Sequence, residues 1–327
     1  GVGFKPDWTW IKNRDATDSH ALYDIARGVT KQLESDNTAV QTTEAEGLTI
    51  FGSDGFTVGN QVQVNTNTED YVSWNWLGNN ATQSISASGS NPTLASTNTA
   101  SDSGSFGICT YTGDGTAGST VKHSLGGVPD MIMFKRFGST TANWIVYTRI
   151  LGAGNTDYLM LDVTNSEGAA GAVNYLNATA ATSTLVTLGD DGNTNADDTF
   201  IMYLFRNVPG VCRIGTYIAN ESADGPYITT GFKPSWIMIK DVAGADNLDW
   251  NILDAAREPF NAANPLNLRA NTTAADEAGS IGDFHILSDG FKLKAASANA
   301  NLNGSQYLYV AMGDIAGGGT LPPVYGR

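Results

Sequence analysis

The sequence GFKPDWTWIK at residues 3–12 returns without a gap as GFKPSWIMIK at residues 231–240. A weaker third version, GVPDMIMFK, occupies residues 127–135. Self-similarity at a fixed period, here roughly 105 residues, indicates that a chain is built from copies of one structural unit. We therefore interpret the 327-residue chain as three copies of a single kind of domain.

Further landmarks follow each copy of the motif in the same order. An arginine recurs at Arg27, Arg149 and Arg257, and recurrence in copies of one fold predicts that it pairs with a nearby aspartate. A short apolar segment closes each copy, with the sequences YVSWNW (71–76), FIMYLF (200–205) and YLYVAM (307–312). The copies span residues 1–78, 108–210 and 211–316, with a linker at 79–107 and a tail at 317–327.

The linker at 79–107 consists almost entirely of Asn, Ser, Thr, Ala and Gly. Such a composition is typical of a flexible or loosely extended connector. We predict that the linker forms no core of its own and that the first copy can sit apart. The second and third copies are joined by only a few residues, so we expect these two to pack closely.

The apolar runs within each copy are short and rich in β-branched and aromatic residues, and Gly, Asp or Asn bounds them. This pattern favours antiparallel strands over helices. We predict an all-β protein made of tandem antiparallel β-sandwich domains that are jelly-roll-like. Trp8 and Trp236 align with Met131, and a position shared by Trp and Met indicates a large buried slot rather than a sugar-stacking surface.

The first copy lacks the opening segment of the other two. Tyr111 and Tyr217 precede the proline of the second and third copies, whereas Pro6 has only five residues before it. A sandwich without its opening strand presents an unpaired edge of backbone donors and acceptors. We expect either that the native chain continues upstream of Gly1 or that another chain supplies the strand.

The charge balance restricts the kinds of partner. Eighteen Lys and Arg against 33 Asp and Glu give a net charge of -15, which repels nucleic acid and anionic lipid. No apolar run approaches the roughly 20 residues that span a bilayer. We therefore predict neither nucleic-acid binding nor membrane insertion. Cys109 and Cys212 lack the spacing of a zinc site and are predicted to be buried free thiols.

The sequence offers little for catalysis. His20, His123 and His285 occupy different points of the repeat, so each is expected to have an ordinary surface or turn role. Zinc-binding His-Glu-x-x-His, nucleophile-elbow and phosphate-loop motifs are all absent from the sequence. We predict no enzymatic activity, no catalytic residue and no cofactor. Sugar hydrolysis stays open because it needs only two carboxylates.

One acidic segment, GDDGNTNADD at residues 189–198, is the candidate metal site. Asp191, Asn193, Asn195 and Asp197 stand at alternate positions, and their oxygens are the kind that Ca²⁺ prefers. The segment lacks the central Gly and the final Glu of a helix-loop-helix calcium site. We favour a solvated acidic turn and keep calcium at these four residues as the alternative.

Four features together resemble the repeats of virion structural and tail-fibre-like proteins of tailed bacteriophages, especially marine ones. They are the Gly-Phe-Lys-Pro-x-Trp motif, the Asp-x-x-Arg after it, the Ser-Asp-Gly-Phe turn at 53–56 and 288–291, and the Tyr-rich closing segment. The resemblance covers nearly the whole chain. It implies a non-enzymatic structural protein on the exterior surface of the virion, with a tail-fibre or host-adhesion subunit as the favoured role.

Two alternatives to this role remain. One is a capsid-decorating or other virion-surface structural protein, and the other is a polysaccharide-binding or polysaccharide-degrading protein. The expected partners are other copies of the chain, other virion proteins and a host surface glycan or protein. We expect a homo-oligomer, because avidity strengthens weak surface contacts, and the resemblance favours a trimer.

Overall fold

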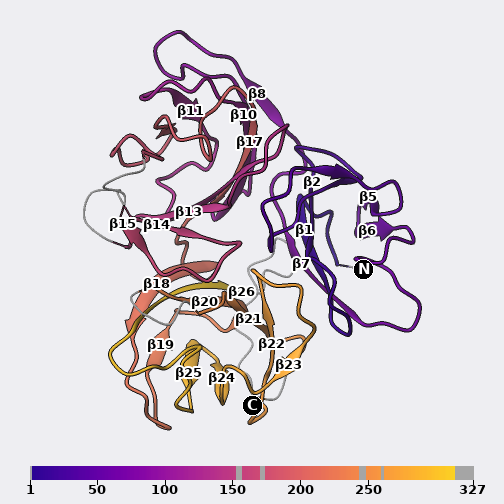
Figure 1. Ribbon diagram of the computed structural model, residues 1–327, viewed down its shortest axis with the longest axis vertical. Helices are drawn as coiled ribbons and strands as arrows, with labels where there is room; N and C mark the ends of the chain where they lie inside the picture. Colours follow the sequence, from indigo (N-terminus) through magenta and orange to yellow (C-terminus); the bar gives the residue numbers. More distant parts are fainter. Residues whose placement is uncertain (1, 152–156, 170–173, 243–247, 259–260, 314–327) are drawn as a thin grey trace. The chain divides into compact units, whose positions relative to one another are not determined.

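The computed structural model describes residues 2–151, 157–169, 174–242, 248–258 and 261–313. The protein is all-β, as the sequence predicts, and its sheets are antiparallel (Figure 1). None of the described residues belongs to a helix that could cross a membrane. The chain divides into two compact units, Gly1–Val163 with Gly168–Arg206, and Thr164–Glu167 with Asn207–Arg327.

The first repeat is built on a three-stranded sheet with the order β2-β1-β7. These strands are β1 (Trp8–Asn13), β2 (Ala21–Asp24) and β7 (Tyr71–Trp76). Two hairpins complete the repeat, namely β3 (Lys31–Gln32) with β4 (Thr42–Thr43), and β5 (Leu48–Gly52) with β6 (Gly55–Val58). A small core joins the sheet to the second hairpin and comprises Ile11, Ala21, Tyr23, Leu48 and Val64.

The second repeat has the largest sheet, with the order β15-β14-β13-β12-β17-β10-β9-β8. Its central strands are β10 (Phe106–Thr112), β12 (Met131–Arg136), β13 (Ile145–Thr148) and β17 (Thr199–Phe205), and its outer ones are β8 (Gln83–Ile85), β9 (Ser96–Ala100), β14 (Asp157–Met160) and β15 (Gly168–Ala169). A second sheet pairs β11 (Thr120–Lys122) with β16 (Leu185–Thr187). The core between them includes Phe134, Phe200 and Val186.

The third repeat follows the same plan in the second unit. Its large sheet has the order β18-β26-β20-β21-β22-β23, and its small sheet has the order β19-β25-β24. The strands are β18 (Cys212–Ile218), β19 (Tyr227–Thr229), β20 (Pro234–Asp241), β21 (Asn251–Asp254), β22 (Leu266–Arg269), β23 (Glu277–Ala278), β24 (Phe284–Leu287), β25 (Gly290–Leu293) and β26 (Gln306–Gly313). Ile237, Phe291 and Tyr309 lie in its core.

The linker prediction was wrong in two respects. Residues 83–85 and 96–100 form β8 and β9, and β9 pairs with β10 and so extends the sheet of the second repeat. The first repeat does not sit apart, because it belongs to the same compact unit as the second. A backbone of Ser, Thr and Asn can pair with a sheet edge without a core of its own, and composition does not reveal that edge. The tail at 317–327 lies outside the described residues.

Trp8 is buried, as predicted, and so is Trp236. The packing of Trp8 differs from the prediction, because its indole lies among aromatic rings of two repeats rather than inside one sandwich. It stacks on Trp76 with ring centroids 4.2 Å apart and on Tyr203 at 4.4 Å. Phe106 adds a further stacked ring at 5.7 Å. The outer face of the first sheet is therefore covered by the second repeat.

Two strands that open the second and third repeats have no counterpart in the part of the first repeat that the structure describes. In the second repeat, β10 pairs with β17 and β11 belongs to the small sheet. In the third repeat, β18 pairs with β26 and β19 belongs to the small sheet. Among the described residues, no strand of the first repeat takes either place, so β7 is an edge strand of its sheet. The expected edge is therefore present. Cys109 and Cys212 are both buried and free, as the sequence predicts.

Candidate functional site

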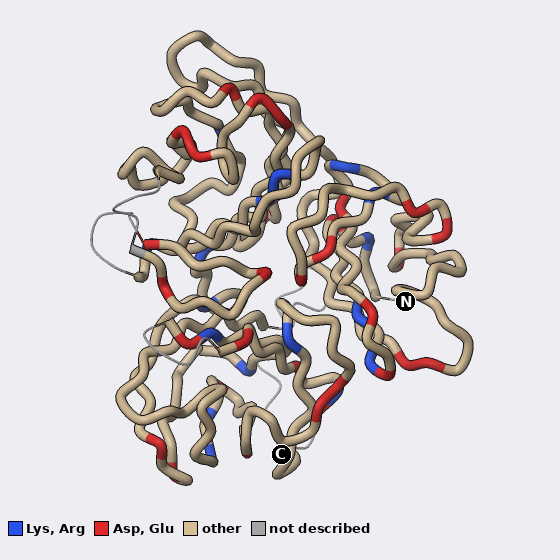
Figure 2. Tube along the Cα trace, viewed as in Figure 1, with Lys and Arg blue, Asp and Glu red and all other residues tan. Residues whose placement is uncertain are grey.

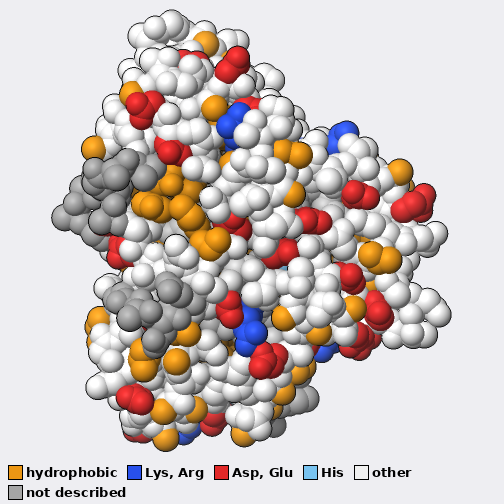
Figure 3. All heavy atoms as spheres, viewed as in Figure 1, with side chains coloured by type: hydrophobic (Ala, Val, Ile, Leu, Met, Phe, Trp, Pro, Cys, Tyr) orange, Lys and Arg blue, Asp and Glu red, His pale blue; other side chains and the backbone are white. Residues whose placement is uncertain are grey.

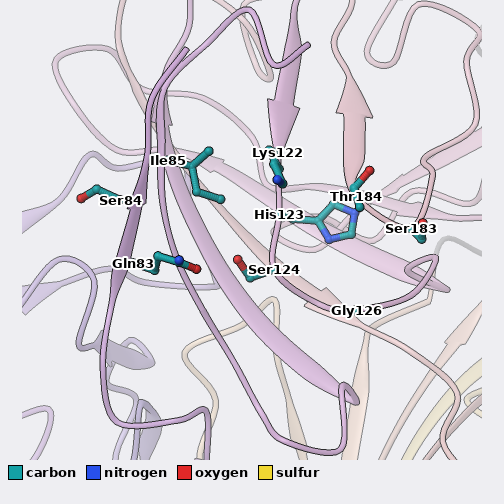
Figure 4. A pocket seen from close by; sticks show the side chains of 9 residues that line it. All are labelled: Gln83, Ser84, Ile85, Lys122, His123, Ser124, Gly126, Ser183 and Thr184. Atoms are coloured by element: carbon teal, nitrogen blue, oxygen red, sulfur yellow. The ribbon is translucent and has the colours of Figure 1, made fainter. Parts of the chain in front are cut away.

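A pocket of about 440 Å³ in the first unit is formed by segments that are distant in the sequence. Its walls are β8, the end of β11 with the turn after it, and the turn before β16 (Figure 4). The lining residues are Gln83, Ser84, Ile85, Lys122, His123, Ser124, Gly126, Ser183 and Thr184. This volume lies within the range of sites that bind small molecules.

Residues of the linker segment form hydrogen bonds that fix the backbone of the pocket. Ser96 Oγ on β9 donates a hydrogen bond to the Lys122 carbonyl at 2.8 Å, and Asn98 Nδ2 donates to the same oxygen at 3.2 Å. Side chains alternate along a strand, and Figure 4 shows Ser84 pointing away from its neighbours Gln83 and Ile85. The linker therefore supplies one wall of the pocket and fixes the backbone of another.

The lining is polar and hydroxyl-rich. Ser124, Ser183 and Thr184 carry hydroxyl groups, and Gln83 carries an amide, so each of them can both donate and accept hydrogen bonds. Lys122 has an exposed side chain and is the one formally charged residue of the lining, while Ile85 adds an apolar contact. The lining residues include no carboxylate. Such a surface fits a polar ligand that is neutral or negatively charged.

His123 serves the structure of the pocket rather than its chemistry. It is 2% exposed, and its Nδ1 accepts a hydrogen bond from the Leu125 N–H at 3.3 Å. That leaves the proton on Nε2, which donates to the Thr182 carbonyl at 3.2 Å. Burial lowers the pKa of His123, against the opposing effect of the Thr182 hydrogen bond. The imidazole is therefore neutral at neutral pH, and backbone groups occupy both of its nitrogens.

The sequence predicts a surface or turn role for each histidine, and two of the three do not lie at the surface. His20 and His123 are buried, and only His285 is partly exposed, beside Asp283. His20 accepts a hydrogen bond on Nδ1 from the Trp10 indole at 2.7 Å. The aromatic partner that permits this burial comes from another strand, so neighbouring residues in the sequence did not reveal it.

Hydrogen bonds within the protein already engage most of the four residues of the predicted calcium alternative. Asp191 Oδ1 accepts hydrogen bonds from the backbone and side-chain nitrogens of Asn193, both at 2.8 Å. Asn193 Oδ1 accepts from the Asn143 N–H at 3.1 Å. Asn195 is buried, whereas Asp197 is exposed. Three of the four side chains thus already accept hydrogen bonds from nitrogen donors, as a self-supporting turn requires.

Asn195 has a structural role that the spacing did not reveal. Its Oδ1 accepts from the backbone nitrogens of Asp114 at 2.9 Å and Gly115 at 3.2 Å. Its Nδ2 donates to the carbonyls of Thr116 at 3.0 Å and Gly189 at 2.7 Å. The amide therefore clamps the turn that follows β10 onto the acidic loop.

The third repeat contains the same clamp. Asn301 Oδ1 accepts from the nitrogens of Asn220 at 3.0 Å and Glu221 at 3.2 Å. Its Nδ2 donates to the carbonyls of Ser222 at 3.0 Å and Ala295 at 2.9 Å. A position that makes four equivalent hydrogen bonds in two repeats is part of the fold.

The predicted pairing of arginine with aspartate is confirmed. Arg27 and Arg257 each contact the aspartate three residues earlier, Asp24 and Asp254, at 2.6 Å. Arg149 pairs with an aspartate as well, but it is not their structural equivalent. Trp8 and Met131 occupy equivalent positions of their strands, and they pair with Asp24 and Thr148 respectively. Thr148 is therefore the equivalent of Asp24, and Arg149 lies one residue after it rather than three.

A family model for the domain of unknown function DUF7483 matches residues 1–314. The chain belongs to this family. The match runs through all three repeats, so the family is defined by the whole array and not by one sandwich. No curated protein and no solved structure is detectably similar to the chain.

Sequence reasoning missed the pocket altogether. Its walls come from residues 83–85, 122–126 and 183–184, which share no motif and lie far apart in the chain. The one local signal is that His123 and Ser124 stand in a turn after a short strand. Serine and threonine are too common in this sequence for their positions to mark a site.

Proposed function

We propose that this chain is a non-enzymatic binding protein on the exterior surface of a virion, namely a tail-fibre or host-adhesion subunit. The virion setting rests on the resemblance of its repeats to tailed-phage proteins. The binding role rests on the pocket beside β8, which gathers hydroxyl, amide and ammonium groups on a β framework. Binding residues on loops held by a rigid scaffold are the usual arrangement in such proteins.

The chemistry of the pocket favours a glycan as the ligand. Sugar hydroxyls both donate and accept hydrogen bonds, as do Gln83, Ser124 and Thr184. Lys122 adds a positive charge, which favours a sugar that carries a carboxylate. Charged side chains form small separate patches on the face drawn in Figure 3, and acidic groups are scattered along the chain in Figure 2. A negatively charged host glycan is therefore expected to bind at Lys122.

Titration calorimetry with oligosaccharides that contain uronic acid, and with matched neutral ones, tests this proposal. We expect the acidic sugars to bind and Lys122→Gln to weaken them about tenfold, because a hydrogen bond to a charged group contributes about 1.5 kcal/mol. Lys233→Gln is the matched control, since Lys233 is exposed outside the pocket. Equal affinity in both variants would remove the pocket from the proposal.

Two further measurements test the remainder of the proposal. Antibody labelling of intact phage particles that carry the chain should mark tail fibres, whereas label spread over the head would favour a capsid-decorating role. Chromatography of the oligosaccharides after long incubation should recover them intact. Shortened products would instead indicate a polysaccharide-degrading enzyme.

A further inference from the structure

Asn98 stands where the core of the second repeat meets the pocket beside β8. Its strand, β9, lies between β10 and β8, so that Asn98 is opposite Cys109 on one side and Gln83 on the other. Directly opposite residues of an antiparallel pair have their side chains on the same face of the sheet. Cys109 belongs to the core of this repeat, and Gln83 lines the pocket. The side chain of Asn98 therefore lies at the inner end of the pocket.

The hydrogen bonds of Asn98 fix the direction of its amide group. Asn98 Nδ2 donates to Ser96 Oγ at 2.8 Å and to the Lys122 carbonyl at 3.2 Å. Ser96 in turn donates its hydroxyl proton to the same carbonyl at 2.8 Å, so both partners of Nδ2 act as acceptors. Turning the amide over would place its oxygen against these two acceptors. Oδ1 is therefore held on the side of the amide away from them.

This oxygen is buried without a hydrogen-bond donor. Asn98 is 1% exposed, and no N–H or O–H group of the described residues donates to its Oδ1. A buried acceptor without a donor costs free energy, and a ligand that supplies the donor recovers that cost. Gln83, the neighbour of Asn98 on β8, is exposed, so its side chain can turn aside to admit a ligand group.

The sandwich does not itself require a polar side chain at this place. The third repeat follows the same plan, but its large sheet ends at β18, whereas the sheet of the second repeat continues from β10 into β9 and β8. Asn98 thus belongs to the part of the second repeat that forms the pocket and not to the framework that the two repeats share. A role in the pocket accounts for a buried amide oxygen that the fold leaves without a donor.

We propose that Asn98 Oδ1 accepts a hydrogen bond from a hydroxyl group of the bound sugar and sets the specificity of the pocket. This inference rests on the proposed glycan-binding function and adds a requirement to it. The acidic sugar must present a free hydroxyl to the inner end of the pocket while its carboxylate meets Lys122.

Asn98 discriminates between sugars in a way that the hydroxyl groups of the lining do not. Ser124 and Thr184 can rotate their hydroxyls to donate or accept, so they adapt to different ligand groups. The amide of Asn98 is fixed and offers only an acceptor. A site built to bind a hydroxyl in this way strongly rejects an analogue that lacks it. The pocket therefore rejects a sugar in which this hydroxyl is missing or is blocked as an ether or ester.

Titration calorimetry of the full chain with methyl glucuronoside and its three monodeoxy derivatives tests the proposal. We expect one derivative to bind the parent chain at least about tenfold more weakly than the complete sugar, because it leaves Oδ1 without a donor. In Asn98→Ala this derivative and the complete sugar should bind equally, since the acceptor that distinguishes them is gone.

Asn267→Ala is the matched control. Asn267 is also 1% exposed, its Nδ2 donates to Asn251 Oδ1 at 3.2 Å and to Ser280 Oγ at 2.8 Å, and its Oδ1 accepts from none of the described residues. It belongs to the second compact unit, whereas the pocket belongs to the first. This variant should keep the full difference between the two sugars.

Ser96→Ala separates specificity from support of the pocket wall. It removes the other side-chain hydrogen bond to the Lys122 carbonyl and leaves Asn98 Oδ1 in place. The difference between the complete sugar and the weak derivative should therefore persist. Its loss in Ser96→Ala as well as in Asn98→Ala would show that both side chains only hold the wall, and would overturn the proposal.

The outcomes distinguish this inference from the proposed function. If the complete sugar binds and Lys122→Gln weakens it, but no derivative is weaker or the difference survives in Asn98→Ala, the glycan site stands and the role of Asn98 is overturned. If the complete sugar does not bind the parent chain, both are overturned. If Asn98→Ala does not fold by thermal melting, carbon-13 NMR of the parent chain decides. The Asn98 side-chain carbonyl resonance should shift with the complete sugar and not with the weak derivative, and an unchanged resonance would overturn the proposal.

Discussion

Trp8 shows how one side chain holds two repeats together. Its indole is 1% exposed and stacks on Trp76 of its own repeat and on Tyr203 of the next. We expect Trp8→Ala to lower the free energy of unfolding by about 3–5 kcal/mol, as for other buried large-to-small changes. Urea denaturation measures this loss. Val62→Ala is the control, because Val62 is 58% exposed and should change stability by less than about 0.5 kcal/mol.

Lys135 is a buried cation that recurs in the third repeat as Lys240. The Lys135 ammonium donates to the carbonyls of Thr38 at 3.0 Å and Ala142 at 2.6 Å, and the Lys240 ammonium donates to the Thr164 carbonyl at 2.6 Å. Burial lowers the pKa of each lysine to about 8, opposed by Asp162 for the first and mainly by Asp241 for the second. Each lysine therefore joins segments far apart in the chain at a cost in desolvation.

These lowered pKa values give a pH dependence of known sign. Below pH 8 both the folded and the unfolded chain keep the lysine protons, and the burial penalty is complete. Between about pH 8 and pH 10 the folded lysine loses its proton first, so the unfolding free energy rises, by up to about 1.4 kcal/mol per pH unit for each lysine. Urea denaturation at several pH values measures this dependence. The unfolding free energy of Lys135→Met should rise less steeply with pH than that of the parent chain. The exposed Lys122→Met should keep the parent slope, and an identical slope in all three chains would contradict the assignment.

At the scale of elements, an asparagine clamp fixes the turn after the opening strand. Asn195→Ala leaves two N–H groups and two carbonyls without their partner, and we expect a loss of about 2–4 kcal/mol. Asn65→Ala is the matched control, because Asn65 takes the same place in the first repeat but is exposed and makes only part of the clamp. Its loss should stay below about 1 kcal/mol. Thermal denaturation of the two variants compares them, and equal losses would show that the clamp does not stabilise β10.

The acidic loop at residues 189–198 allows a prediction about the response of the protein to calcium. The third repeat has Ser297 and Asn299 at the positions of Asp191 and Asn193, yet it keeps the same turn, with Asn301 N–H donating to the Ser297 carbonyl. The turn therefore forms without a carboxylate that could bind a cation. We expect the melting temperature to be unchanged by a chelator or by millimolar Ca²⁺. A rise with Ca²⁺ that is lost in Asp191→Asn would restore the calcium alternative.

At the scale of the whole molecule, the chain carries a net charge of -15, and the binding role that we propose would gain from avidity. Light scattering should give a mass that is a multiple of 34.4 kDa at working concentration, with a trimer favoured by the family resemblance. The mass should persist in high salt if apolar contacts join the copies, and fall if ion pairs do. A mass of 34.4 kDa under all conditions would contradict the homo-oligomer.

Much of the fold was predictable because it repeats. Short runs such as residues 71–76 and 200–205 are strands, and Trp8 and Trp236 are buried, since alternation and residue size act locally. That Arg27 pairs with a nearby aspartate was predictable from the recurrence of the arginine in the copies. Arg149 was misaligned because the order of residues after the repeated motif does not identify a register, which is set by pairing with another strand.

The sequence by itself determined the repeated motif and the all-β class, because periodicity and side-chain size are properties of the chain. Only the tertiary structure decided where the linker pairs, that His123 is buried and neutral, and that Lys122 and Thr184 share a pocket. These features depend on contacts between distant segments, whose register is fixed by packing and hydrogen bonding across the whole sheet rather than by neighbouring residues.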